Sequence, residues 1–369
     1  MFAIYTTELI DSRKRRMPWR TVLEIARHIG AVVFSGDGRS TDVEINGVRV
    51  EYVDKPFTAA AANMLVGRMK EHGITRLYFP VVPGRVYREL QDACDGAEIE
   101  IVWYITSSWN SLCRVLRAWK WIGFRAVRSY LIQALIPKRI WLNLLNRRRL
   151  RPIITMSDFT ARKLVECNYP VDFVHSVLPG LDELKDVDDG SCCLRSKGVP
   201  YFLFFGPPQK IRGIFLILEA AKRLNRRRND FRLVILVRAD ENAKVELEYL
   251  RGYISRMQCS QVEAHFGLVS SEDINKYING AIAILKPFVL VPSEIPLAPM
   301  EAMQRGKLVI GFEGDGTGEL IGKCGIAIKH CCIRNFVKIM SDVLDHKLSY
   351  NKNYNWASWQ QVSNKWKEV

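Results

Sequence analysis

The sequence has no long hydrophobic run, because none of its uninterrupted apolar stretches approaches the roughly 20 residues that span a bilayer. A polytopic membrane protein is therefore excluded. The first residues, MFAIYTTELIDSRKRR, place apolar side chains before a basic cluster, which is the reverse of a secretory leader. We therefore expect no such leader.

Paired cysteines are also missing. The nine cysteines are an odd number, and none of them forms a CxxC motif. This pattern argues against a disulfide framework and a structural zinc, and it favours a reducing cytoplasm. The vicinal pairs Cys192-Cys193 and Cys331-Cys332 can bind a soft metal, but free thiols are the simpler interpretation. We expect no metal site.

Acidic residues are absent from one long stretch. Between Glu100 and Asp158 the sequence has no acidic residue, and it has eleven basic ones there. They are Arg114, Arg117, Lys120, Arg125, Arg128, Lys138, Arg139, Arg147, Arg148, Arg149 and Arg151. Most of the net charge of +15 therefore lies in this stretch. Such a charge indicates an anionic partner, and nucleic acid, an anionic membrane and a phosphorylated substrate all fit it.

The remaining composition is that of a globular protein. Hydrophobic residues make up 48% of the 369 residues and charged residues 25%, enough to bury a core in two to three domains of about 150 residues each. Strand-like apolar runs alternate with amphipathic helices, and Asn46-Gly47 predicts a hairpin turn. Residues 179–199 are acidic and lack periodicity, as linkers do, and the alternation restarts at Tyr201. We predict an α/β protein of two doubly wound, Rossmann-like domains that face each other across a cleft.

One loop of the second half is suited to a phosphate. It connects a predicted strand to a helix and contains Gly206, Lys210, Arg212 and Gly213. The glycines allow close backbone approach, the helix start offers free N–H groups, and the cations neutralise an anion. The alternative is an ordinary turn with solvated charges.

A second loop, in PSEIPLAPMEAMQRGKLVIG, is also suited to an anion. It contains Glu294, and Glu301 falls in the first turn of the helix that follows, so the amides of Leu297 and Ala298 can face a ligand. Glu301 alone can equally be a partner of the helix dipole. The sequence GDGTGEL then forms a glycine-rich turn that carries Glu319.

Together these segments resemble the C-terminal domain of the retaining GT-B glycosyltransferases called glycosyl transferases group 1 (family 4). Their signature P-S-x-x-E-x(7)-E-A-M-x-x-G-x-P-V-I is similar to PSEIPLAPMEAMQRGKLVIG, and their G-G-x-x-E element is similar to GTGEL. The segment VEAHFGLVSSEDINKYINGAIAILKPF resembles the one before the signature, and NYNWASWQQVSNKWKEV resembles a C-terminal helix that returns to the first domain. Residues 150–369 carry the resemblance, whereas the first 150 share only the architecture.

The resemblance implies a GT-B fold with four parts. These are an N-terminal acceptor-binding domain (1–182), a linker (183–199), a C-terminal nucleotide-sugar-binding domain (200–350) and the returning helix (351–369). It also implies an enzyme that transfers a hexose with retention from a UDP- or GDP-sugar, without a metal or other cofactor.

The resemblance further implies roles for single residues. Lys210, Arg212 and the amides around Leu297 and Ala298 would stabilise the charge on the leaving diphosphate. Glu301 would hold the ribose hydroxyls. The catalytic residues would be Lys210, Arg212 and Glu294. The donor-binding residues would be Gly206, Gly213, Gly267, Leu268, Ser293, Leu297, Ala298 and Glu301, with the backbone of Gly267 and Leu268 facing the base.

The chain departs from the family pattern at three points. Six residues, not seven, separate Glu294 from Glu301, so either Glu294 or Ser293 would orient the sugar. Pro207 stands where an arginine often follows the first glycine, and Lys210 would supply the missing charge. Thr106 stands where a histidine often contacts the donor sugar.

The basic stretch also suggests where the acceptor binds. Its cations interleave with apolar residues at near-helical spacing and with five tryptophans: Trp103, Trp109, Trp119, Trp121 and Trp141. Such a segment suits the surface of an anionic bilayer. It can also bind nucleic acid, or it can be a solvated helix whose tryptophans pack against the sheet. We favour the membrane over nucleic acid.

These observations predict a peripheral membrane enzyme of the cytoplasm that acts on a lipid-linked or polysaccharide acceptor. Its acceptor or membrane residues would be Arg13, Arg15, Arg16, Thr106, Trp119 and Trp121. One alternative is a glycosyltransferase whose acceptor is nucleic acid or protein. Another is a non-catalytic GT-B protein that serves as a binding or scaffold module.

Overall fold

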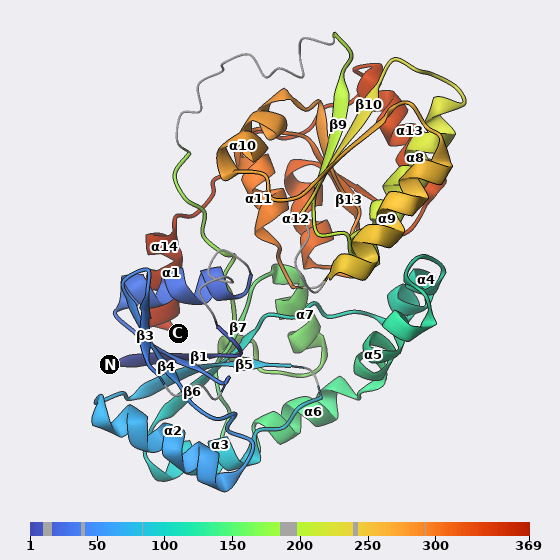
Figure 1. The fold of residues 1–369 in the computed structure, drawn as a ribbon. Helices are drawn as coiled ribbons and strands as arrows, with labels where there is room; N and C mark the ends of the chain where they lie inside the picture. Colours follow the sequence, from blue (N-terminus) through green and yellow to red (C-terminus); the bar gives the residue numbers. More distant parts are fainter. Residues whose placement is uncertain (10–16, 38–40, 83, 185–197, 239–242, 292) are drawn as a thin grey trace.

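The structure is a computed structural model that describes residues 1–9, 17–37, 41–82, 84–184, 198–238, 243–291 and 293–369. It contains two domains, drawn one above the other in Figure 1, and each has a mainly parallel sheet with a hydrophobic core on both faces. The predicted α/β class with two doubly wound domains is confirmed.

The first domain has a sheet of eight strands among the described residues, in the order β3-β4-β2-β1-β5-β6-β7-β8. Its elements are β1 (Phe2–Thr6), α1 (Trp19–Ile29), β2 (Val32–Ser35), β3 (Val43–Ile45), β4 (Val48–Tyr52), α2 (Ala59–Glu71), β5 (Arg76–Val81), α3 (Arg88–Gly96), β6 (Glu100–Ile105), α4 (Leu112–Ile122), α5 (Phe124–Leu135), α6 (Lys138–Leu145), β7 (Ile153–Thr155), α7 (Asp158–Glu166), the 3-10 helix η2 (Val171–Phe173) and β8 (Val174–Ser176). The strand β3 pairs antiparallel with β4. Their turn has Asn46 at a φ of 54° and Gly47 at 75°, the left-handed values of a tight hairpin turn, so the hairpin prediction is confirmed.

The second domain has a sheet of six strands among the described residues, in the order β11-β10-β9-β12-β13-β14. Its elements are β9 (Tyr201–Gly206), the 3-10 helix η4 (Lys210–Arg212), α8 (Ile214–Asn225), β10 (Arg232–Val237), α9 (Lys244–Met257), β11 (Val262–Phe266), α10 (Ser271–Gly280), β12 (Ala283–Lys286), α11 (Leu297–Gln304), β13 (Val309–Phe312), α12 (Gly316–Cys324), β14 (Ile326–Ile328) and α13 (Ile333–Leu344). All its strand pairs are parallel, as expected for strands connected by helices.

The last helix, α14 (Trp359–Glu368), packs on the first domain although it follows the second in sequence. Its Val362 and Trp366 join the core between α1 and the first sheet. The hydroxyl of Tyr78 on β5 donates to Trp366 O at 2.7 Å. Ser358 and Gln361 cap the start of the helix in a reciprocal capping box.

Part of the basic stretch forms three short helices, α4, α5 and α6, which extend along one side of the first domain, with α4 next to the second domain (Figure 1). Ser111 caps α4, and Gly123, at a φ of 79°, separates it from α5. One face of α4 packs against the second domain, where Val115 and Ala118 lie in one apolar cluster with Val289 and Leu290. This apolar contact joins the two domains next to the cleft.

No described helix is long and apolar enough to cross a bilayer. The seven cysteines within the described residues are all free, including the vicinal Cys331 and Cys332. The other vicinal pair, Cys192 and Cys193, lies outside the described residues, as does most of the predicted linker.

Candidate active site

The site begins where the strand order of the second sheet reverses, between β9 and β12. The strands β10 and β11 lie on one side of this point, and β13 and β14 lie on the other. Open parallel sheets bind ligands there, because the loops that leave the two strands turn apart. Gly206 and Lys286 are the last residues of β9 and β12 and therefore border the site.

The loop after Gly206 folds tightly against the chain that follows β12. Gly213 has a φ of 81°, and a Cβ atom there would lie 2.0 Å from Pro287 O, so the position requires glycine. The backbone N–H of Val289 donates to Ile211 O at 2.8 Å. The missing Cβ of Gly206, at a φ of 144°, faces open space. Gly213 thus allows the close approach of the chain at Pro287, whereas the backbone of Gly206 is left uncovered by other residues of the structure.

The two predicted cations of this loop have different neighbours. Lys210 Nζ lies 4.5 Å from the centroid of the Tyr249 ring on α9. Arg212 Cζ lies 6.0 Å from the centroid of the Phe288 ring, and its charge helps to lower the pKa of Lys286. Arg212 therefore lies with the strand ends, whereas Lys210 lies towards α9.

Lys286 was not among the predicted site residues. Its Nζ donates to Phe205 O at 2.5 Å and lies 3.3 Å from the centroid of the Phe205 ring. Burial lowers its pKa well below the usual value, and the charge of Glu301 opposes this effect. A buried amine with a perturbed pKa, at the carboxyl end of a parallel strand, is typical of a binding site. The signal in the sequence is a lone cation that ends the apolar run AIAIL.

Helix α11 packs against β12 and β13 and brings Glu301 towards the cleft. The half-buried Glu301 accepts a hydrogen bond from Arg20 Nη1 at 3.2 Å. Arg20 lies on α1 of the first domain and also pairs with Asp182. The predicted ribose-binding carboxylate therefore lies at the domain boundary, where a cation from the other domain holds it. The first-turn residues Leu297 and Ala298 are buried and half-buried.

Glu294 is fully buried between the domains. Its Oε2 accepts from the backbone N–H of Met156 at 3.0 Å, and its Oε1 accepts from the Ser157 hydroxyl. Its own backbone N–H donates to Thr106 O at 2.8 Å. Burial raises its pKa to about 7. The structure thus brings together Glu294 and Thr106, two predicted site residues, and it shows that both carboxylate oxygens contact the first domain. Ser293, the other candidate at this motif position, is half-buried.

The predicted base-binding residues follow β11, the edge strand two positions from β9. The backbone N–H of Gly267 donates to Val237 O at 3.0 Å, and its φ of 131° turns the chain away from the sheet. The next side chain, Leu268, is 83% exposed. The Leu268 side chain is therefore open to solvent at this edge, whereas the N–H of Gly267 is bonded within the sheet.

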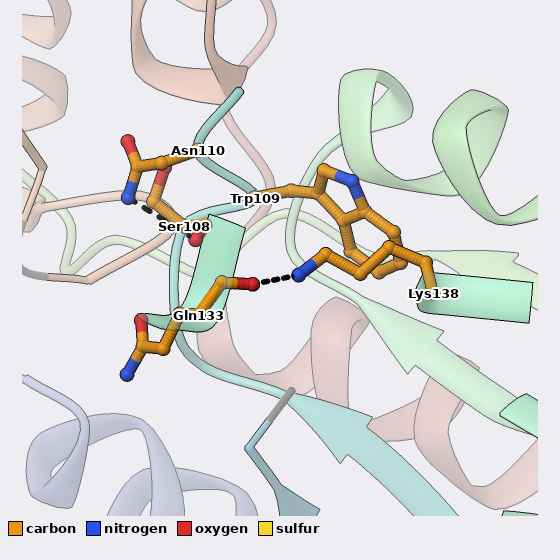
Figure 2. A pocket seen from close by; sticks show the side chains of 5 residues that line it. All are labelled: Ser108, Trp109, Asn110, Gln133 and Lys138. Atoms are coloured by element: carbon orange, nitrogen blue, oxygen red, sulfur yellow. Dashed lines mark hydrogen bonds between the residues drawn. The ribbon is translucent and has the colours of Figure 1, made fainter. Parts of the chain in front are cut away.

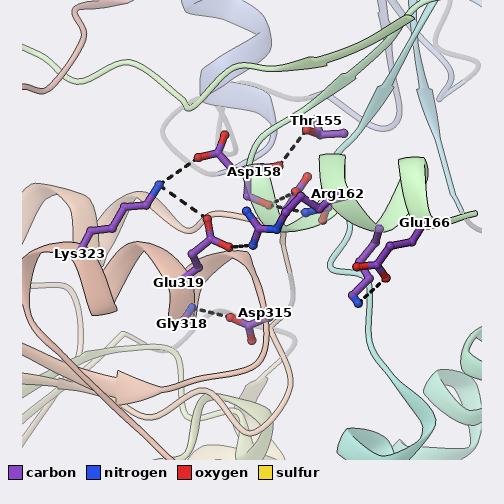
Figure 3. A network of polar contacts seen from close by, with 12 residues as sticks. Thr155, Asp158, Arg162, Glu166, Asp315, Gly318, Glu319 and Lys323 are labelled. Carbon is purple, nitrogen blue, oxygen red and sulfur yellow. Dashed lines mark hydrogen bonds and ion pairs between the residues drawn. The ribbon is translucent and has the colours of Figure 1, made fainter. Parts of the chain in front are cut away.

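A polar network joins α7 of the first domain to α12 of the second (Figure 3). Lys323 Nζ lies 2.9 Å from Asp158 Oδ2 and 3.6 Å from Glu319 Oε1, and Arg162 pairs with Glu319. Hydrogen bonds from Ser176 and Lys323 lower the pKa of Asp158. Glu319, which the sequence placed in the GTGEL element, therefore lies in an ionic contact between domains.

A buried ion pair lies deeper in the same boundary. Arg114 on α4 is 4% exposed, and its Nη2 lies 2.5 Å from Asp315 Oδ2. Arg114 also donates to Glu313 O at 2.7 Å and to Phe288 O at 3.2 Å. Asp315 caps α12 by accepting from Gly318 N. Arg114 belongs to the basic stretch that was predicted to bind an anionic partner. The structure shows instead that its side chain connects the two domains.

Several other members of the basic stretch are also internal. Arg151 is buried and forms a bidentate pair with Asp95. Trp103, Trp109 and Trp141 are buried in the core of the first domain, as the alternative of tryptophans packed against the sheet expected. The membrane interpretation is therefore wrong for these residues. Of the two tryptophans predicted for an acceptor or membrane, Trp121 is half-buried against two apolar clusters, whereas Trp119 is 50% exposed.

A small hollow lies beside the loop after β6 (Figure 2). It has room for about one water molecule, with a volume of about 10 Å³, and is lined by Ser108, Trp109, Asn110, Gln133 and Lys138. The amine of Lys138 donates to Gln133 O, and burial lowers its pKa. Trp109 and Lys138 belong to the basic stretch, but none of the lining residues was predicted to bind the donor or the acceptor. The predicted cations Arg13, Arg15 and Arg16 lie outside the described residues.

Comparisons with known proteins agree with this architecture. Residues 199–346 match the model of the family "Glycosyl transferases group 1". Sucrose-phosphate synthase from Thermosynechococcus elongatus superimposes with a TM-score of 0.71 over 100% of this chain and 97% of its own, at 11% identity. Anabaena HepE, solved in complex with UDP and glucose, gives a TM-score of 0.68 over 100% and 98%, at 14% identity. A search of curated proteins gave no significant match.

The structural likeness, at such low identity, concerns the fold, and the family match concerns the second domain. Both agree with the resemblance inferred from the sequence, which is confirmed. The chain therefore has the GT-B fold, and its residues 199–346 are similar to the glycosyl transferases group 1 family.

Proposed function

We propose that this protein is a retaining hexosyltransferase that uses a nucleoside-diphosphate sugar and acts on a lipid-linked or polysaccharide acceptor at an anionic membrane surface. The observation that carries the proposal is the pairing of two sites. Arg212 and Lys286 lie at the strand ends of the second domain, and an exposed apolar and basic surface lies on the first.

The donor site is supported by the charges at the ends of β9 and β12. Arg212, Lys286 and the first turn of α11 provide positive potential where a leaving diphosphate develops negative charge, so no metal is required. Glu301 can accept hydrogen bonds from ribose hydroxyls if its hydrogen bond with Arg20 breaks, or if one of its oxygens binds Arg20 while the other binds the ribose. The Anabaena relative was solved with UDP and glucose, which supports a UDP-sugar as the first donor to try.

Retention is supported by the carboxylates of the site. A double displacement requires a nucleophilic carboxylate that is free to attack the sugar. Both oxygens of Glu294 are hydrogen-bonded to the first domain. We therefore propose reaction on the front face of the donor, with the leaving phosphate accepting the proton of the acceptor hydroxyl.

The acceptor side is supported by α4, α5 and α6. Their exposed apolar residues range from 39 to 64% exposed and are Leu112, Leu116, Trp119, Phe124, Ile132, Leu135, Ile140 and Leu144. The Trp119 and Phe124 rings lie 5.4 Å apart, so they form one patch. Exposed Arg117, Lys120 and Arg128 lie on the same two helices. Apolar and cationic side chains together favour an anionic bilayer.

Nucleotide binding tests the donor half of the proposal. Thermal unfolding is measured with UDP, GDP, ADP and the UDP- and GDP-hexoses, in buffer with and without EDTA. A ligand at about 100 times its Kd stabilises the folded protein by about 2.7 kcal/mol. We expect one diphosphate to give this shift in EDTA. Loss of charge-assisted hydrogen bonds to ribose should weaken its binding to Glu301→Ala about tenfold or more.

Glu272→Ala is the matched control, because Glu272 is an exposed carboxylate of α10 in the same domain. We expect this variant to bind as the wild type does. If no nucleotide shifts the unfolding temperature of the wild type, the enzyme proposal is wrong, and the non-catalytic scaffold is the better interpretation. A shift that requires a divalent cation contradicts the metal-independent mechanism alone.

A further inference from the structure

Lys286 occupies an unusual place for a lysine. It is 3% exposed and is the last residue of β12. In the strand register it is level with Phe205 on β9, the residue before Gly206. Its Nζ therefore lies at the carboxyl edge of the second sheet, between these two strands. Its contacts are the carbonyl and ring of Phe205 and, at 5.4 Å, the ring of Phe204. Within the described part of the chain, a single carbonyl and two aromatic faces leave the other N–H groups of an ammonium without acceptors.

The amine also lacks a counter-ion. Among the ion pairs of the described residues, no carboxylate lies within 4.0 Å of Lys286 Nζ. The charges that act on it are Arg212 on η4, which disfavours its protonation, and Glu301 on α11, which favours it. Glu301 is itself paired with Arg20. Burial adds to the effect of Arg212, and the pKa of Lys286 falls well below its usual value. A protein interior tolerates such a cation poorly unless a ligand compensates it.

The surroundings of the amine suit a diphosphate. Open space lies over Gly206, the first turn of α11 follows on the same face of the sheet as Lys286, and Arg212 adds a second positive charge. The loop after β9 begins with two prolines, so its first cation is Lys210, whose Nζ lies against the ring of Tyr249. Lys286 is therefore better placed than Lys210 to meet an anion at the strand ends.

We infer that Lys286 binds the diphosphate of the donor nucleotide and takes up a proton as the nucleotide binds. The inference rests on the proposed function and names a residue of its donor site. The proton comes from solvent and is returned when the diphosphate leaves, so the binding of a nucleoside diphosphate is linked to pH.

The inference is tested with Lys286→Met, which preserves the length of the side chain and removes the amine. Lys338→Met is the matched control, because Lys338 is an exposed lysine on α13 of the same domain. Calorimetric titrations with UDP and GDP are made at pH 8 in HEPES and in Tris, whose heats of ionisation differ and which contain no phosphate, and are repeated with uridine and guanosine.

We expect Lys286→Met to lose at least tenfold in affinity for the diphosphate and to keep the affinity for the nucleoside, since only the diphosphate contacts the amine. Wild type and Lys338→Met should show a buffer-dependent heat that reports proton uptake, and Lys286→Met should lose it. The ligand-free Lys286→Met protein should unfold at a higher temperature than the wild type, because an apolar side chain replaces an uncompensated buried amine.

The other outcomes overturn the inference and can be told apart. If the wild type binds neither UDP nor GDP, the proposed function fails with it. If wild type and Lys286→Met bind the diphosphate equally, only the inference fails. If Lys286→Met loses affinity for diphosphate and nucleoside alike and unfolds at a lower temperature, Lys286 has a structural role.

Discussion

Glu294 is a carboxylate enclosed in a contact between two domains. Its neighbours Ser157 and Met156 belong to the start of α7 and the end of β7, and each donates a hydrogen bond to it. These bonds favour the charged form, but burial outweighs them and raises the pKa to about 7 from an ordinary value of 4.5. Glu294 therefore keeps its proton in the folded protein at pH values at which the unfolded chain has lost it.

This shift predicts how stability depends on pH. Between about 4.5 and 7 the folded protein binds a proton that the unfolded chain does not, so the free energy of unfolding falls as the pH rises. The loss above pH 7 is about 3 kcal/mol. Denaturant titrations across this range should show that Glu294→Gln, which stays neutral, lacks this decrease and is more stable than the wild type at pH 8.

The exposed Glu272→Gln serves as the control for Glu294→Gln and should retain the decrease. A Glu294→Gln profile that still falls between pH 4.5 and 7 would assign the decrease to another group. Glu294→Gln that is less stable than the wild type at pH 8 would show that the charged carboxylate is favoured in this contact.

At the scale of elements, α4 packs on the second domain through one face, and α4 to α6 expose apolar side chains elsewhere. The buried face of α4 packs on Val289 and Leu290 of the second domain. On α4, Leu116 and Trp119 are 49 and 50% exposed. Together with the exposed Phe124 on α5 they form an apolar patch. Exposed apolar patches of this kind mark an interaction site. A helix that contacts both the second domain and a membrane would hold the cleft close to the bilayer.

We predict that this patch binds anionic vesicles. In co-sedimentation with vesicles that contain phosphatidylglycerol, the double variant Trp119→Glu, Phe124→Glu should lose at least tenfold in binding, because it removes apolar contacts and adds negative charge. Val245→Glu on α9 is the control, since Val245 is 78% exposed on the second domain. Equal binding of both variants would show that the vesicles bind another surface of the protein. If the wild type does not bind at low salt, the membrane proposal is contradicted.

The sequence predicted the elements better than the side-chain contacts. Alternating strands and helices follow from local periodicity, and the Asn46-Gly47 hairpin follows from the conformations these residues adopt. The partners of Arg114 and Glu294 lie 201 and 137 residues away, at Asp315 and Ser157. No local pattern identifies such pairs, so the basic stretch was predicted as one surface although part of it is buried.

The donor site was predicted from motifs that lie close together in the sequence. Gly206, Arg212 and Glu301 were proposed for this site because the loops after β9 and β12 each carry a short recognisable pattern. Lys286 and Arg20 were missed, since one ends an ordinary apolar strand and the other lies in the distant first domain. Their importance follows from strand order and domain packing, which a single sequence does not reveal.

At the scale of the whole molecule, the two domains are connected by contacts of different strength. Arg114 and Asp315 are 4% and 1% exposed. Arg162 and Glu319 pair at the surface, with side chains 59% and 22% exposed. Exposed pairs contribute little and are screened by salt, whereas removal of one partner from a buried pair leaves an uncompensated charge. The contact between the two domains should therefore depend on Arg114 more than on the network of Figure 3.

The final prediction compares these two contacts. Arg114→Met leaves Asp315 buried without its cation and should destabilise the closed arrangement by about 3–5 kcal/mol. Small-angle X-ray scattering should then show a larger radius of gyration, while circular dichroism shows both domains still folded. Arg162→Met should cost less than about 1 kcal/mol and leave the scattering unchanged. Asp315→Asn, added to Arg114→Met, should restore part of the closure because it removes the buried charge. Equal opening by the two single arginine variants would show that the surface network, and not the buried pair, holds the cleft closed.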